Sequence, residues 1–326
     1  MTRHVLCVDE RPYCVWDNGI TNFNAEYLNS INPKFYEFIA HQNYNIIIDK
    51  DANKESKQFA ALLLRNYYTQ ALETLFALIF ATLQSPKCIS GWMLNYRNVD
   101  LYSLVEKVNK NISIKIRFKI NEKFNWERIV KIIFSYLDDN SEAKPIIVEN
   151  FSGLLNSFVT DFLNENLRNE YNSVKHGFRA QSGGFTLEIQ PPEKSNINIP
   201  KSELKNLLHS EYGSAFYTEE KIPERKNQYC INYHALNWNP ENIYHGIYFI
   251  SLLINNIITF LKLYNELQIE GIEYLVELPN RLFNYPWKNI AGSGAFKLGG
   301  EVDLDTIPKI TDEQIFSIYH NTYIEN

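Results

Sequence analysis

Residues that break or cross-link a polypeptide chain are scarce in this sequence. Its 326 residues include 4 cysteines, 13 glycines and 12 prolines. Four scattered cysteines are too few for the disulfide framework of a small secreted protein. Few glycines and prolines favour long regular elements, and helices in particular. The N-terminal residues carry acids and Pro12 where a secretory signal peptide has an apolar run, so we expect a cytoplasmic protein.

An excess of positive charge is also missing. The chain has 32 Lys and Arg against 38 Asp and Glu, a formal net charge of -6. An acidic protein does not bind polyanions over its whole surface, so any contact with nucleic acid requires a local basic site. The apolar share of 45% and the charged share of 21% exclude intrinsic disorder as the main state.

One apolar run, residues 243–264, has the length of a membrane span. It contains His245, Asn255, Asn256 and Lys262, each of which is costly in hydrocarbon. We therefore expect a buried core helix here, and no contact of the protein with a membrane.

Apolar spacing predicts long helices, and period-two alternation predicts a few strands. The long helices are expected over 24–48 (broken near Pro33), 51–84, 148–176 and 240–267, with shorter ones over 100–109 and 125–137 and from Thr311. The helix over 148–176 is expected to be one rod of about 40 Å. Strands are expected over 112–120, 228–238 and about 273–278, and Gly183-Gly184 predicts a hairpin within 178–189.

These elements predict a mainly α protein of the α+β class, a helical bundle with β-hairpins as decorations between the last long helices. The helical core would consist of residues 51–84, 148–176 and 240–267. A β-rich insertion would cover about 177–238, and a mixed C-terminal segment about 268–326. Since no linker separates two parts, we expect a single elaborated domain over 1–326.

Familiar cofactor and metal motifs are missing. The glycine-rich run 292–300 lacks the preceding strand, the spacing and the following helix of a phosphate loop, and it is expected to be a loop or hairpin. His4, Cys7 and Cys14 match no zinc spacing. We therefore expect no cofactor and no metal ion.

The segment from Leu167 to Arg179 concentrates polar and basic groups. Arg168, Asn172 and His176 lie at i, i+4 and i+8, so they share one face of a helix. Lys175 is one position off that face, and Arg179 follows just beyond the helix end. Such a cluster suits an anion, above all a phosphate. An imidazole beside a guanidinium is the minimum set for metal-free RNA cleavage, in which the imidazole moves a proton and the guanidinium stabilises the phosphorane charge.

This segment resembles the HEPN superfamily of helical nucleotide-binding domains. The matching positions are Arg168-Asn169 and His176-Gly177, together with Asn172 and Lys175. Seven residues separate the arginine from the histidine, more than in the catalytic members. The resemblance implies a homodimer with facing motifs and metal-independent ribonuclease activity in a toxin or phage-defence role. Arg168 and His176 would be catalytic, and Asn169, Asn172, Lys175 and Arg179 would bind RNA.

A helix end alone explains part of this segment. Lys and His in the last turn interact favourably with the negative end of the helix, and Gly177 suits the left-handed conformation that follows. In this alternative the chain is a non-catalytic helical interaction or scaffold protein. Helix termination does not require Arg168, Asn172 or Arg179, and these residues favour the hypothesis of an RNA site.

Overall fold

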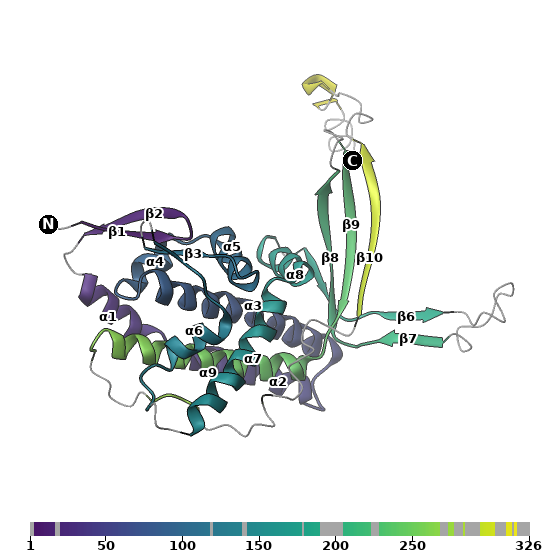
Figure 1. The fold of residues 1–326 in the computed structure, drawn as a ribbon. Coiled ribbons are helices and arrows are strands. Elements are labelled where there is room, and N and C mark those ends of the chain that lie inside the picture. Colours follow the sequence, from purple (N-terminus) through teal and green to yellow (C-terminus); the bar gives the residue numbers. More distant parts are fainter. Residues whose placement is uncertain are drawn as a thin grey trace.

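The fold is mainly α with small β-sheets, which confirms the predicted α+β class (Figure 1). The computed structural model describes residues 3–16, 20–117, 120–138, 142–177, 179–189, 205–222, 228–267, 273–276, 283, 294–303, 311–314 and 316–317. Helices form one body, and three long strands extend away from it (Figure 1).

The centre of the helical body is α3, Lys54–Gln84. It packs against α2 (Lys34–Ile48) and α9 (Pro240–Tyr264), which also contact each other, and α1 (Ile20–Ser30) contacts α9. The α3 helix begins at Asn53, whose side chain accepts a hydrogen bond from the Ser56 N–H at 2.8 Å. Nearly all of its second half is buried, because that half is apolar on almost every face.

Most of α9 is buried inside the protein, as expected for a core helix. In the part of the chain that the structure describes, it alone is long and apolar enough to cross a membrane. The side-chain amide of its buried Asn256 donates to the Leu275 carbonyl at 3.1 Å and accepts from the Leu275 N–H at 2.8 Å. Residues of α3, α9 and α7 (Ala143–Phe162) share one hydrophobic cluster. The organisation of 1–326 as one elaborated domain stays a prediction.

The prediction of one continuous helix over 148–176 is wrong. The helix α7 ends at Phe162, and a separate helix, α8, covers Glu165–Lys175. The break arises because Asn164 caps α8, and its side chain accepts hydrogen bonds from the N–H groups of Asn166 (2.9 Å) and Leu167 (3.3 Å). Three shorter helices complete this part of the body, α4 (Ile89–Asn95), α5 (Asn98–Asn109) and α6 (Trp126–Ile133).

The strands form antiparallel sheets. Three are hairpins, β1 (Arg3–Val8) with β2 (Arg11–Trp16), β3 (Ile114–Arg117) with β4 (Ile120–Glu122), and β6 (Thr186–Ile189) with β7 (Lys205–His209). The fourth sheet has the order β10-β9-β8-β5, from Gly294–Asp303, Gln228–Asn237, Gly213–Lys221 and Ala180–Ser182. The predicted strand at 228–238 is thus confirmed as β9. Where one strand was expected over 112–120, residues 114–117 and 120–122 form the two strands of a hairpin.

Two strand predictions need correction. The expected hairpin within 178–189 is wrong, because β5 pairs with β8 while β6 pairs with β7. The side chain of Asn237 separates them, donating to the Phe185 carbonyl and accepting from the Phe185 N–H, both at 2.8 Å. Residues 273–276 are not a strand, and 277–278 lie outside the described residues. The expected C-terminal helix is described only at 312–314 and 316–317, where the chain is helical.

A buried ion pair attaches α8 to the rest of the protein. Arg65 of α3 donates from Nε to Glu170 Oε2 at 2.8 Å, and both side chains are 2% exposed. The other oxygen of Glu170 accepts hydrogen bonds from Trp238 Nε1 at 3.0 Å and from the Ser214 hydroxyl. One carboxylate therefore links α8 to α3, β8 and the start of α9. Such a pair stabilises the fold only when its partners are all present.

We expect Glu170→Ala to lower the free energy of unfolding by about 3–5 kcal/mol, because it leaves the guanidinium of Arg65 buried without its carboxylate. Urea denaturation followed by circular dichroism measures this loss. The matched control is Glu165→Ala on the exposed side of the same helix, where the 72% exposed carboxylate should contribute at most about 1 kcal/mol. Equal losses in the two variants would contradict this role of the buried pair.

Candidate functional site

A cavity of about 420 Å³ lies between α3, α5, α7 and α8. Its lining includes Arg168, Asn172 and His176, the three residues that the sequence places on one helix face. Glu170 and Ser173 lie on the opposite, buried face of α8. The remaining lining residues are Thr69, Glu73, Asn98, Val99, Tyr102, Phe162, Leu167 and Tyr171.

The guanidinium of Arg168 lies over an aromatic ring. Its central carbon is 4.6 Å from the ring centroid of Tyr102 on α5, and one terminal nitrogen is 3.5 Å from the carboxylate of Glu165. The Arg168 side chain is 40% exposed. A stacked, half-exposed guanidinium keeps N–H donors available for an anion while its position stays fixed.

His176 is the residue at which α8 ends. Its N–H donates to the Asn172 carbonyl at 2.9 Å, and Gly177 follows with a φ of +94°. This left-handed conformation explains why glycine follows the histidine, as the helix-end alternative predicts. The side chain of His176 is exposed and lines the cavity. His176 therefore both ends the helix and lines the cavity.

The other three predicted RNA-binding residues do not line the cavity. Lys175 is exposed, with its ammonium 5.5 Å from the ring centroid of Tyr171, so its charge lies at the cavity's edge. Arg179 is exposed, and its N–H donates to the Ser173 carbonyl at 2.7 Å. Asn169 is half-buried on another side of α8.

A carboxylate that sequence reasoning missed lies in the same cavity. Glu73 accepts hydrogen bonds from the Asn98 side chain at 3.0 Å and from the Tyr171 hydroxyl at 3.4 Å. Burial raises the pKa of Glu73, although the charge of Lys175 and the hydrogen bond from Tyr171 oppose this shift. One signal was available in the sequence, since Glu73 is the one charged residue of the mostly apolar stretch 71–83. No sequence signal distinguished Tyr102 from the other tyrosines, of which the chain has 21 in total.

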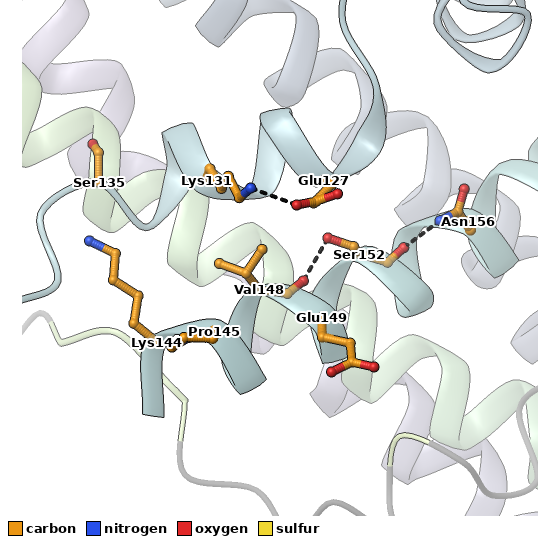
Figure 2. Close-up of a pocket in the computed structure, with 9 residues that line it drawn as sticks. All are labelled: Glu127, Lys131, Ser135, Lys144, Pro145, Val148, Glu149, Ser152 and Asn156. Atoms are coloured by element: carbon orange, nitrogen blue, oxygen red, sulfur yellow. Dashed lines mark hydrogen bonds and ion pairs between the residues drawn. The ribbon is translucent and has the colours of Figure 1, made fainter. Parts of the chain in front are cut away.

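A larger hollow of about 940 Å³ lies between α6 and α7 (Figure 2). Several of its polar side chains are paired within the chain. Lys131 pairs with Glu127 at 2.6 Å, Lys144 donates to the Leu137 carbonyl at 2.8 Å, and Ser152 donates to the Val148 carbonyl at 2.6 Å. Figure 2 shows these groups along the helices with no cluster of donors directed at one point. This hollow is therefore a weaker candidate than the α8 cavity.

No group of three or more His, Cys, Asp or Glu side chains suited to a metal ion occurs among the residues that the structure describes. His234 and His245 do not line the α8 cavity. His234 is buried, stacked on Phe216 and hydrogen bonded to the Thr218 hydroxyl at 2.7 Å. His245 is 4.0 Å from Glu241 at the start of α9.

We expect the pH dependence of stability to carry a contribution from Glu73. Because burial raises its pKa in the folded state, the folded protein binds this proton more tightly than the unfolded chain. The contribution of Glu73 to stability is therefore full below its ordinary value of 4.5 and is lost as the pH rises through the folded-state pKa. Glu73→Gln removes this loss, so the variant should gain stability relative to wild type from pH 4.5 toward neutral.

Urea unfolding at a series of pH values measures that difference. Tyr171→Phe is the matched control, since it keeps the carboxyl but removes a hydrogen bond that lowers the pKa of Glu73. Its pH-dependent loss should be larger than that of wild type. A difference between Glu73→Gln and wild type that does not change with pH would contradict the assignment.

Comparison with protein-family models, curated proteins and solved structures finds no match to this chain. The resemblance to the HEPN superfamily therefore rests on residues 168–177 and their surroundings.

Proposed function

We propose that this chain is a HEPN-like protein that binds RNA in the α8 cavity and cleaves it without a metal ion. One observation carries the proposal. The guanidinium of Arg168, the amide of Asn172 and the imidazole of His176 line one solvent-accessible cavity, with Lys175 at its edge. A polyanion that extends along the cavity meets donors from three successive turns of one helix.

The spacing along α8 favours a polymer over a small phosphate. Eight residues at 1.5 Å each put the Cα atoms of Arg168 and His176 about 12 Å apart along the axis. Side chains of a helix point toward its N-terminus, so the guanidinium of Arg168 points away from His176 and toward Tyr102. A single phosphate meets one of these groups, whereas a chain with repeated phosphates meets both.

In this proposal His176 acts as general acid or base and Arg168 holds a phosphate. The 2′-oxygen loses its proton and bonds to phosphorus, the bond from phosphorus to the 5′-oxygen breaks, and that oxygen takes up a proton. One imidazole provides one of the two proton transfers, and water provides the other. Asn172 and Lys175 contact the chain beside the reacting phosphate, while Asn169 and Arg179 contribute only where the RNA extends beyond the cavity.

The resemblance adds a setting to this chemistry. It implies a second copy of the chain as partner and a role as a toxin or in defence against phages. The few, scattered cysteines favour a cytoplasmic location. Neither a cofactor nor a metal ion takes part in the proposed reaction.

The competing hypothesis is a non-catalytic helical interaction protein. The pairing of Arg168 with Tyr102 and Glu165, and the position of His176 at a helix end, favour it, because both residues then have structural roles. It predicts that removing the imidazole changes stability by about 0.5–2 kcal/mol and leaves function intact.

An RNase assay in EDTA on varied single-stranded RNA tests the proposal. We expect His176→Ala to lower the cleavage rate about 100-fold or more, the usual cost of losing a general acid or base. Arg168→Ala should weaken both cleavage and the binding of a 2′-O-methyl RNA that cannot be cleaved. The matched control, His41→Ala, removes an exposed histidine from α2 and should change neither.

Cleavage that is equal in wild type and His176→Ala excludes the catalytic role. If RNA binding is also equal in wild type and Arg168→Ala, or undetectable in both, the RNA proposal fails as a whole and the interaction protein is favoured.

A further inference from the structure

The outer edge of β10 is an open β-strand edge. Its ten residues pair with β9 along one side, and none of the described residues pairs with the other side. Figure 1 shows β10 as the outermost of the three strands that extend from the helical body. Such an edge presents a row of backbone N–H and C=O groups that another strand can pair with.

The sequence of β10 has few features that block such pairing. It reads GAFKLGGEVD, with no proline, and its pairing with β9 has no bulge. Residues 295–301 are all exposed, and Leu298 and Phe296 are 58% and 37% exposed. Natural edges are protected by prolines, bulges or charged side chains. Over 295–301 this edge has no proline or bulge, and its charges, Lys297 and Glu301, are of opposite sign, so they oppose a partner strand of one charge but not a second copy of β10.

Two charges of β10, Lys297 and Glu301, are complementary to a second copy of the same strand. Lys297 and Glu301 lie two residues on either side of Gly299, on the same face of the strand. In an antiparallel pair of two β10 strands with the twofold axis at Gly299, each Lys297 lies opposite Glu301 of the other copy. The same register places Leu298 opposite Gly300, which has no side chain to clash with it.

The ammonium of Lys297 already lies over the sheet face that carries Lys297, Gly299 and Glu301. It pairs with Glu220 of β8 at 2.9 Å, and its side chain is 48% exposed. Glu220 lies in the same cross-strand row as Glu301, through Cys230 of β9. That row carries two acidic residues, and in a second copy Lys297 would lie next to it, opposite Glu301.

The other face of the sheet carries exposed apolar side chains. Leu298, Tyr233 and Tyr217 form one cross-strand row, with Leu298 58% and Tyr217 53% exposed. Ile231 and Phe296 are also exposed on this face. Pairing through β10 would join two such faces, so that Leu298 lies between apolar rows of both copies instead of at an edge.

We propose that two copies of this chain associate through β10, antiparallel and centred on Gly299, to form one continuous sheet across the twofold axis. This interface involves neither the α8 cavity nor RNA, and it does not depend on the proposed function.

Sedimentation velocity over a range of protein concentrations tests the proposal with a charge-reversal cycle. Lys297→Glu places Glu opposite Glu, and Glu301→Lys places Lys opposite Lys, each twice because of the symmetry. Each single variant should raise the dimer dissociation constant about tenfold or more, the cost of like charges across an interface. The double variant Lys297→Glu/Glu301→Lys restores opposite charges and should restore the dimer.

The matched control is Lys131→Glu on α6, away from β10. It reverses the charge of an exposed lysine that, like Lys297, pairs with a glutamate of the same chain, and it should leave the dimer unchanged. Thermal unfolding of each variant checks that the fold is kept. A wild-type protein that stays monomeric at its highest soluble concentration overturns the proposal. A dimer that the single charge reversals do not weaken also overturns it. If the double variant fails to restore association, the register centred on Gly299 is wrong.

Discussion

The buried ion pair between Arg65 and Glu170 determines which side of α8 faces the solvent. Residues of an α-helix are rotated by about 100° from one to the next, so side chains two positions away point to nearly the opposite side. With Glu170 held by Arg65, Trp238 and Ser214, Arg168 and Asn172 have to point away from the core. His176, at the end of the same helix, shares their cavity. A charged residue at 2% exposure thus orients the groups of the candidate site.

The proposed binding of RNA places an electrostatic requirement on the candidate site. A chain with a net charge of -6 repels polyanions at long range, so RNA binding needs cations gathered at one place. Arg168 and Lys175 provide them, each placed over an aromatic ring. The carboxyl of Glu73 in the same cavity opposes an anion when ionised, and burial raises its pKa, which lowers the cost of neutralising it. Proton uptake by Glu73 and anion binding should therefore favour each other.

The sequence predicts what is local in this structure. Apolar periodicity locates α3 and α9, and the spacing of Arg168, Asn172 and His176 alone predicts that they share a face. The break at Asn164 could also be predicted, because asparagine followed by Glu165 is typical of a helix start. The helical apolar spacing on both sides of Asn164 favoured one continuous helix instead. Contacts between residues far apart in the sequence could not be predicted from it. Glu73 and Tyr102 enter the cavity from helices about 100 and 70 residues away, and Asn237 separates β5 from β6 across 52 residues. The glycine-rich run, expected to be a loop or hairpin, includes a strand because β9 offers it a ten-residue ladder.

The most direct test of the account follows the His176 imidazole by NMR while a 2′-O-methyl RNA oligonucleotide is added in EDTA. The signal is assigned by its loss in His176→Ala. The account predicts that the His176 signal moves and saturates with the RNA, that the signal of His41 stays unchanged, and that the response is weakened in Arg168→Ala. A His176 signal that does not move while the RNA binds elsewhere, or does not bind, would contradict the claim that this face of α8 is an RNA site.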